Sequence, residues 1–210
     1  MTEEVRTVAA FDFDGTITRS DTLIPFLRRS VGSVRTARAL LTLSVRITQS
    51  MAGGGSRDAV KEELLRRILA GQPVAVLEAV GESFADHLVA HRLRRKTLEH
   101  IERHRTAGHE LVVVSASPEI YVAPVARRLG FAAALGTRLE VGPDDRLTGR
   151  LIGRNCRGPE KVRRLKEWLG DEACTVVAYG DSKGDRELLA FSGDGAVWIT
   201  RRGRARRYSS

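Results

Sequence analysis

The chain has 210 residues, of which 42% are hydrophobic, so it is long enough to bury the core of one domain or of one domain with an insertion. No apolar run reaches the ~20 residues that a membrane-spanning helix needs, and the first residues lack the pattern of a signal peptide. These features favour a cytoplasmic protein. Cys156 and Cys174 form no metal-ligand pattern, so we expect both to be reduced thiols.

The net charge of +9 owes much to arginines that gather in residues 28–57 and 201–207. Such a charge suits a nucleic-acid partner. Aromatic residues, however, make up only 5% of the chain, and none alternates with the basic runs as base-stacking side chains do. We therefore expect no nucleic-acid binding, and we interpret the second arginine block as a solvated, frayed terminus.

The first predicted element is a strand, because residues 8–11 form an apolar run typical of a strand buried on both faces. Asp12 and Asp14 follow it, and Gly15 then predicts a turn. Two carboxylates at the carboxyl end of a parallel strand suit a hard cation and a phosphate. The alternative is an ordinary strand that ends in an Asp-Gly turn, and the motif alone does not decide between them.

Helical patterns follow over residues 22–50, 58–70 and 74–90 with no strand pattern between them, which predicts an inserted helical bundle. The first helix has a broad apolar face flanked by arginines, made by Val34, Ala37, Leu40, Leu41, Leu43, Ser44, Val45, Ile47 and Thr48. This face either packs into the small core of the bundle, which we favour, or lies on an anionic membrane surface.

Another helix is predicted over residues 91–107. His100 and His104 in it have the i, i+4 spacing that a metal site can use. Because no third ligand lies nearby in the sequence, we favour a solvated helix face over a metal site.

Two more buried strands are predicted over 111–114 and 175–179, and each runs directly into polar residues. Ser115 follows the first, where a strand meets a helix start and can hold a phosphate, while Ser117 is a candidate helix cap. Asp181 and Asp185 follow the second strand. Lys161 lies in the first turn of a helix that begins at 158, an unfavourable place for a cation unless an anion is near.

A hairpin over 138–152 and a last strand over 196–199 complete a pattern of alternating strands and helices. This pattern predicts a parallel sheet covered on both faces, with its ligand crevice at the carboxyl ends of the strands. Four carboxylates would meet in that crevice and repel one another unless a divalent cation lay among them. Mg²⁺ fits, because it takes oxygen ligands and keeps positions open for a phosphate.

The chain resembles the haloacid dehalogenase (HAD) superfamily in four motifs. In order, these are Phe11–Thr16, Ser115 after a buried strand, Lys161 at a helix start, and Gly180–Asp185. The Gly-Pro-Glu-Lys helix start resembles the phosphoserine-phosphatase-like branch, subfamily IB. This resemblance covers residues 8–199. It implies an α/β fold in which residues 1–21 and 93–210 form a Rossmann-like, three-layer parallel-sheet core, and residues 22–92 form a small helical cap inserted after the first strand.

The resemblance also implies roles for the motif residues. Asp12 would be the nucleophile that becomes an aspartyl phosphate, and Asp14 would be general acid and then general base. Ser115 and Lys161 would hold the phosphoryl oxygens. The implied Mg²⁺ ligands are Asp12, Asp14 through its backbone carbonyl, and Asp181, with Asp185 in support.

Substrate choice is expected to depend on the cap. Asp21 matches the glutamate with which phosphoserine phosphatases read an amino group, and Arg66 and Arg67 lie near the position of their carboxylate-binding arginine. The chain also resembles bacterial phosphatidylglycerophosphate phosphatases. The shared features are the aspartate at position 21, the Gly-x-Glu-Lys and Asp-Ser-Lys runs, and residues 198–203.

The expected function is therefore a Mg²⁺-dependent phosphomonoester hydrolase that acts on a small phosphorylated metabolite. One alternative is a phosphatase of a membrane lipid phosphate such as phosphatidylglycerophosphate, peripheral to the inner face of the membrane. A phosphotransferase and a phosphate-binding module without turnover are the others. The sequence makes no prediction of the oligomeric state.

Overall fold

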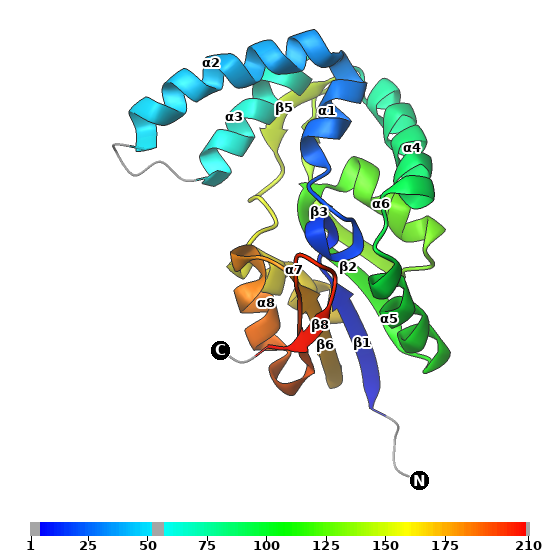
Figure 1. The fold of residues 1–210 in the computed structure, drawn as a ribbon. Coiled ribbons are helices and arrows are strands. Elements are labelled where there is room, and N and C mark those ends of the chain that lie inside the picture. The colour runs from blue at the N-terminus through cyan, green and yellow to red at the C-terminus, as the bar shows by residue number, and fades with distance from the viewer. Residues whose placement is uncertain (1–4, 52–56, 209–210) are drawn as a thin grey trace.

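The computed structural model describes residues 5–51 and 57–208 and, for residues 44–51 and 57, the backbone alone. Within this part of the chain, six strands form one sheet in the order β3-β2-β1-β6-β7-β8 (Figure 1). These strands are β1 (Arg6–Phe11), β2 (Glu110–Pro118), β3 (Ala133–Thr137), β6 (Cys174–Gly180), β7 (Ala196–Ile199) and β8 (Ala205–Arg207). β1 lies at the centre, parallel to β2 and β6, and only β8 runs antiparallel to its neighbour.

Alternate residues of β1 belong to two separate cores. Val8 and Ala10 pack with α7 and α8, whereas Ala9 and Phe11 pack with α5 and α6 on the other face. These helices are α5 (Arg95–Thr106), α6 (Glu119–Arg128), α7 (Pro159–Leu169) and α8 (Arg186–Phe191). A strand that is apolar on both faces is what a parallel sheet between two helical layers requires. The predicted three-layer α/β fold is confirmed.

Four further helices lie together beyond one end of the sheet (Figure 1). They are α1 (Leu23–Val31), α2 (Ser33–Met51), α3 (Arg57–Leu69) and α4 (Val74–His91). The prediction of one continuous helix over 22–50 is wrong at Gly32, which separates α1 from α2 with φ 85° and ψ 157°. Glycine adopts this backbone conformation without the steric cost that a side chain would add.

The apolar face predicted for α2 is wider than the surface that the helix buries. Leu43 is buried, but Val34 and Leu41 are 74% and 71% exposed, and Ala37 on the same stripe is exposed as well. The prediction that this face packs into the bundle is therefore wrong for its outer stripe, because one neighbouring layer covers only one side of a helix. The predicted contributions of Ser44, Val45, Ile47 and Thr48 lie outside the described side chains.

The predicted hairpin over 138–152 is present as β4 (Leu139–Val141) and β5 (Leu147–Leu151). It packs against α3 and is hydrogen-bonded to the segment between α3 and α4. The N–H of Gly71 donates to the carbonyl oxygen of Leu147 at 2.8 Å, and the N–H of Leu147 donates to that of Gln72 at 2.9 Å. The hairpin is thus joined by its main chain to the helices α1–α4.

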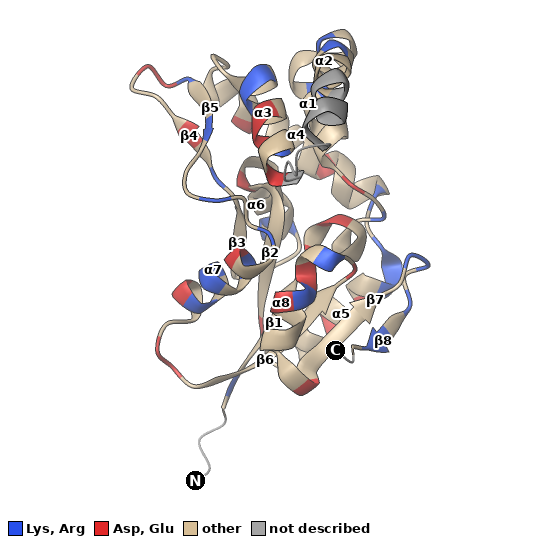
Figure 2. Ribbon diagram, turned by 90° about the vertical axis from the view of Figure 1, so that its left-hand side faces the viewer, with Lys and Arg blue, Asp and Glu red and all other residues tan. Residues whose placement is uncertain are grey.

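The described part of the arginine-rich end, residues 201–208, includes the paired strand β8, so the prediction of a frayed terminus is wrong for these residues. Figure 2 shows the Lys and Arg residues of β8 and the turn before it beside β7. β8 pairs with β7, the Tyr208 ring stacks on Trp198 with centroids 5.9 Å apart, and Arg207 forms an ion pair with Asp194 at 2.6 Å. Among the helices described, none combines the length and apolarity needed to cross a bilayer.

Candidate active site

Three adjacent strands bring the predicted motif residues to one edge of the sheet. β1 pairs in register with β2 and β6 as far as Phe11. Because parallel strands in register end at the same edge, three motif residues meet there: Asp12 directly after β1, Ser115 in the carboxyl-terminal part of β2, and Asp181 directly after β6. The N–H of Asp12 donates to the carbonyl oxygen of Tyr179 at 2.9 Å, so pairing with β6 extends to the first aspartate.

Lys161 lies between two carboxylates at the bottom of the site. Its Nζ donates to Oδ1 of Asp12 at 2.5 Å and to Oδ1 of Asp185 at 2.6 Å, and its side chain is 2% exposed. Burial lowers the pKa of Lys161, but the two carboxylates outweigh burial and raise this pKa above its ordinary value. The lysine therefore stays charged, and these anions explain a cation in the first turn of α7.

The pKa values of the two carboxyl partners of Lys161 shift in opposite directions, although burial acts on both in the same way. Burial raises the pKa of Asp12 well above the ordinary value, and the nearby charge of Asp185 adds to this effect. For Asp185, burial is outweighed by Lys161 and by hydrogen bonds from Ser182, so its pKa is lowered. Oδ2 of Asp185 accepts hydrogen bonds from the N–H groups of Asp181 and Ser182, at 3.2 and 2.9 Å. Asp185 thus holds both the lysine and the loop after β6.

Asp14 is held by hydroxyl groups from two parts of the fold. Thr22 Oγ1 donates to its Oδ1 at 2.7 Å, and the Ser117 hydroxyl donates to its Oδ2. Burial, with a further contribution from the charge of Asp21, raises the pKa of Asp14 to about 6. Ser117 does not cap α6 as expected, since the residue before α6 is Pro118.

The carboxylates fit a divalent cation. Oxygen atoms of Asp12, Asp181 and Asp185 lie within 4.8 Å of one another, and oxygen is the ligand that Mg²⁺ prefers. Both oxygens of Asp185 already accept hydrogen bonds, which leaves Asp12 and Asp181 as the freer ligands. Burial raises the pKa of Asp181 to about 6, so a bound cation would favour its ionised form. Gly15 leaves room for this arrangement, because a Cβ there would collide with the Asp181 carboxylate.

Beside this cluster lies a pocket of about 280 Å³, lined by Asp12 and Asp185 but not by Asp181. Its floor is formed by the motif residues Asp12, Asp14, Ser115, Lys161 and Asp185. Its wall and mouth are formed by Asp21, Leu23, Asp58, Lys61, Ala116, Ser117, Asn155, Arg157, Ser182 and Gly184. The pocket therefore joins an anion-binding floor to a polar mouth shared by the sheet loops and the helices α1 and α3.

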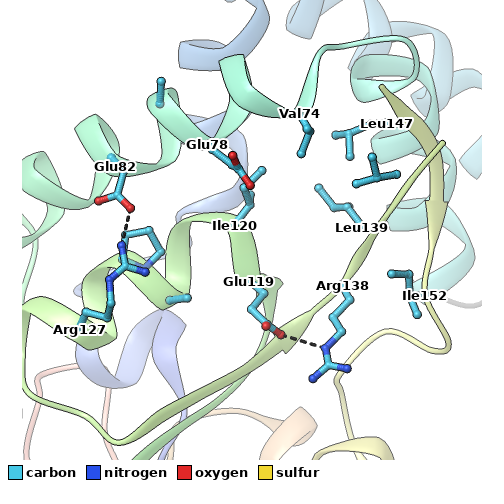
Figure 3. A pocket seen from close by; sticks show the side chains of 14 residues that line it. Val74, Glu78, Glu82, Glu119, Ile120, Arg127, Arg138, Leu139, Leu147 and Ile152 are labelled. Atoms are coloured by element: carbon cyan, nitrogen blue, oxygen red, sulfur yellow. Dashed lines mark hydrogen bonds and ion pairs between the residues drawn. The ribbon is translucent and has the colours of Figure 1, made fainter. Parts of the chain in front are cut away.

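A larger hollow of about 600 Å³ lies between α4, α6 and the hairpin, with an apolar lining that includes Val74, Ile120 and Leu147 (Figure 3). Ion pairs stand at its rim, Glu119 with Arg138 at 3.4 Å and Glu82 with Arg127. It contains none of the motif residues, so the smaller pocket is the candidate active site.

Residues 9–190 match the family model of the haloacid dehalogenase-like hydrolases. The chain belongs to this family. Among relatives of this haloacid dehalogenase-like hydrolase, protein CicA of Caulobacter vibrioides is 37% identical over 194 residues, which cover 92% of this chain and 86% of CicA. Phosphoserine phosphatase SerB1 of Mycobacterium tuberculosis is 32% identical over 205 residues, which cover 90% of this chain and 64% of SerB1.

One solved structure, of a protein with unknown function from Bordetella pertussis Tohama I, matches this hydrolase with a TM-score of 0.74 and 27% identity. The match covers 89% of this chain and 87% of that chain. The resemblance to the HAD superfamily drawn from the motifs is therefore confirmed.

The structure separates the three candidate specificity residues of this HAD-like hydrolase. Asp21 lines the mouth of the pocket. Arg66 and Arg67 do not line it; both guanidinium groups form ion pairs with Glu63, at 2.8 and 2.5 Å. The expected place of a substrate-reading arginine is thus occupied by a local ion-pair cluster on α3.

Lys61 is a pocket residue that the sequence interpretation missed. It reaches from α3 to the sheet loops, where its Nζ donates to the carbonyl oxygen of Ala116 and to Oδ1 of Asn155, the latter at 2.7 Å. The only sequence signal for it is the i, i+3 spacing of Asp58 and Lys61, which places both on one face of a helix. That signal is too common to identify a site by itself.

The histidines of α5 are neither fully solvated nor part of a metal cluster among the described residues. His104 Nε2 lies 2.9 Å from the Tyr179 hydroxyl, and His104 Nδ1 lies 2.8 Å from Nδ1 of His109. Burial lowers the pKa of His104 to about 4, so it is a neutral ring packed against Phe11. The predicted solvated face is wrong for this residue.

Proposed function

We propose that this chain is a Mg²⁺-dependent phosphomonoester hydrolase that works through an aspartyl-phosphate intermediate on a small phosphorylated metabolite. The observation that carries the proposal is the buried Asp12–Lys161–Asp185 cluster, with Asp14 held beside it over the same pocket. The similarity to SerB1, a phosphoserine phosphatase, supports the reaction class.

In the first step, Asp12 is the nucleophile. Lys161 holds Oδ1 of Asp12, and we assign the attack on phosphorus to the other oxygen, Oδ2. The new Oδ2–P bond forms as the bond from phosphorus to the leaving oxygen breaks, and Asp14 gives that oxygen a proton. Ser115 and the Lys161 ammonium bind the oxygens of the transferring group and offset its charge.

In the second step, water hydrolyses the aspartyl phosphate. Asp14, now ionised, takes a proton from the attacking water, and the bond between phosphorus and Asp12 breaks. The hydroxyl groups of Thr22 and Ser117 keep the Asp14 carboxylate in place through both proton transfers. The products are inorganic phosphate and the free enzyme.

The residues that would hold Mg²⁺ are Asp12, Asp181 and Asp14 through its backbone carbonyl. When bound, the ion supplies positive charge that offsets the phosphoryl oxygens. Asp185 supports this arrangement through Lys161 and through the loop that carries Asp181.

Residues 1–21 and 93–210 are proposed to act as the catalytic core, with residues 22–92 as its cap. The pocket is small, about 280 Å³, and most of its lining residues are polar, which favours a compact polar leaving group. Asp21 is exposed at this mouth and is proposed to contact the part of the substrate that is released.

The test is phosphate release from a panel of phosphomonoesters, with Mg²⁺ and with EDTA. The panel contains phosphoserine, histidinol phosphate, sugar phosphates and phosphatidylglycerophosphate. Metal-dependent release by the wild type, lost in Asp12→Asn and kept in the surface variant Asp171→Asn, is expected. A folded wild-type protein that binds Mg²⁺ and phosphate but releases none would instead indicate a binding module.

The exposed stripe of α2 favours a second candidate, a phosphatase of a membrane lipid phosphate. Val34 and Leu41 are 74% and 71% exposed, and Arg35 and Arg38 on the same helix are exposed cations suited to an anionic surface. Val34→Glu with Leu41→Glu should abolish release from phosphatidylglycerophosphate in vesicles and leave soluble substrates unaffected. Equal activity of the double variant on vesicles would remove this candidate.

A further inference from the structure

We propose that Asp58 and Lys61 of α3 form a clasp on Ser115–Ser117, the segment near the carboxyl end of β2, and that Lys61 is a positioning residue for phosphate binding. The proposal rests on the phosphate-binding role given above to Ser115. It adds a contribution from the helices α1–α4 that no motif of the chain records.

The clasp consists of three hydrogen bonds between side chains of α3 and the loops of the sheet. Lys61 Nζ donates to the carbonyl oxygen of Ala116 and, at 2.7 Å, to Oδ1 of Asn155. Asn155 Nδ2 in turn donates to Oδ1 of Asp58 at 2.7 Å. Because Asp58 and Lys61 are three residues apart, one face of α3 presents both to the same partner.

The partners of the clasp are rigidly held. Thr137 Oγ1 donates to the Ala116 carbonyl oxygen at 2.5 Å and lies 2.8 Å from Oδ1 of Asn155, while the N–H of Cys156 donates to Thr137 Oγ1 at 3.1 Å. Asn155 and Thr137 are 5% and 0% exposed. The Lys61 ammonium thus completes a buried polar network instead of lying against a mobile surface.

The position of Ala116 links the clasp to the reaction site. Its carbonyl belongs to the peptide that leads into Ser117, whose hydroxyl holds Asp14 and whose N–H donates to Ser115 Oγ at 3.0 Å. Holding this carbonyl from α3 therefore fixes the orientation of both serines. Without the Lys61 ammonium, the peptide keeps one hydrogen bond, from Thr137, and loses the charge-assisted one.

The clasp joins two parts of the fold that a hollow separates elsewhere. The hairpin β4–β5 is hydrogen-bonded to the segment between α3 and α4, yet faces α6 across the hollow (Figure 3). Asn155 lies in the segment between the hairpin and α7, so its hydrogen bonds with Asp58 and Lys61 link α3 directly to residues that line the pocket.

The experiment measures Mg²⁺-dependent binding of inorganic phosphate by calorimetry, so it needs no knowledge of the substrate. Lys61→Met should raise the Kd of phosphate about tenfold, because a hydrogen bond from a charged group to the loop is lost. Lys61→Arg, which keeps a charged donor, should restore most of the affinity. Lys96→Met, on an exposed face of α5, serves as the matched control and should bind as the wild type does.

A second arm follows amide hydrogen exchange of residues 111–118 without any ligand. Faster exchange of this segment in Lys61→Met than in Lys96→Met, with unchanged exchange in β6, supports the clasp. Wild-type affinity and exchange in Lys61→Met would overturn it, as would equal loss of affinity in Lys61→Arg and Lys61→Met. If the wild type binds no phosphate, the proposed function fails. The hydrogen-exchange measurement, which needs no ligand, still tests whether Lys61 holds residues 111–118.

Discussion

Lys161 is a fully buried cation whose stability depends on two anions. Moving an ammonium group out of water costs several kcal/mol, and only close, well-oriented partners offset that cost. Asp12 and Asp185 supply them at 2.5 and 2.6 Å. The same three side chains therefore stabilise one another and form the floor where a phosphoryl group would bind.

Asp14→Asn tests the proton transfers assigned to this carboxyl group. It should lower kcat for an alkyl phosphate by about 10²–10⁴, because a positioned acid contributes that much to the departure of a poor leaving group. For an aryl phosphate, whose leaving group departs without a proton, the loss in the first step should be much smaller. The measurement is single-turnover formation of the phosphoenzyme with both substrates, and equal losses would contradict the assigned role. Asp194→Asn, at the surface ion pair with Arg207, is the control.

The charge of Lys61 gives a pH dependence that can be separated from other titrations. Burial lowers the pKa of Lys61 to about 8, although Asp14, Asp58, Asp21 and Cys156 act in the opposite direction. Because the folded-state pKa is lowered, the ammonium is present below about pH 8 and is lost as the pH rises through it. Phosphate affinity of the wild type should therefore fall between pH 7 and 9 relative to that of Lys61→Arg, whose guanidinium stays charged. Parallel pH profiles of the two proteins, measured by calorimetry, would rule out this dependence.

Among the elements, the turn after β1 has the tightest steric requirement. Gly15 has φ 79°, and a Cβ there would meet the Asp181 carboxylate from the neighbouring strand end. One loop can approach the other only because this position has no side chain. The spacing of the two aspartate-bearing loops, and with it the cation site, depends on this glycine.

Gly15→Ala should therefore weaken Mg²⁺ binding, in addition to a loss of stability of about 1–2 kcal/mol from the left-handed backbone. The matched control is Gly153→Ala, where φ is 74° and nothing lies within 4 Å of the added Cβ. Gly15→Ala should lose at least as much stability in urea unfolding as Gly153→Ala, because only its Cβ meets Asp181, and only Gly15→Ala should lose Mg²⁺ affinity in calorimetry. Unchanged Mg²⁺ affinity in Gly15→Ala would show that Asp181 moves aside without consequence.

The strand β8 forms one edge of the sheet and is expected to contribute to stability. It covers the edge of β7 and stacks Tyr208 on Trp198. Removing residues 205–210 should lower Tm by about 2–4 °C, as expected for a loss near 1 kcal/mol in a chain of this size. Mg²⁺ affinity should not change, because these residues are not among those that line the pocket and the Arg201 carbonyl that accepts a hydrogen bond from Arg94 is kept. A Tm equal to that of the whole chain would show that the pairing adds no stability.

At the scale of the whole molecule, stability and the cation site are coupled. The sheet brings the carboxylates of Asp12, Asp181 and Asp185 within 4.8 Å of one another, and their mutual repulsion is present only in the folded state. A cation that binds this cluster therefore stabilises the folded chain over the unfolded one.

Thermal unfolding with MgCl₂ and with EDTA measures this coupling. At a Mg²⁺ concentration 100 times its Kd, Tm should rise by about 5–10 °C, which corresponds to about 2.7 kcal/mol of stabilisation. Asp181→Asn should remove the increase, whereas Asp171→Asn, at the surface, should keep it. An increase of the same size in Asp181→Asn would place the stabilising ion elsewhere.

The sequence by itself determined the strands β1, β2, β6 and β7 of the sheet and the motif residues of the pocket. Asp12 and Ser115 directly follow apolar runs, and Asp181 follows one after Gly180. Parallel strands that lie side by side end at one edge, so local pattern and sheet geometry suffice to bring these residues together. Lys161 could also be identified from the sequence, because a cation at a helix start is unfavourable unless an anion lies nearby. β3 and β8 were missed, since neither Ala133–Thr137 nor the arginine-rich end carries a clear strand pattern.

Only the tertiary structure decided what the helices contribute to the pocket. Asp58, Lys61, Arg66 and Arg67 lie on one helix and are equally plausible as pocket residues by sequence, but the rotation of α3 against the sheet directs the first two inward and leaves the arginines with Glu63. The same holds for α2, where helix packing alone selects which part of a broad apolar face is covered. Helix orientation results from contacts between residues far apart in the chain, and periodicity within one helix carries no record of them.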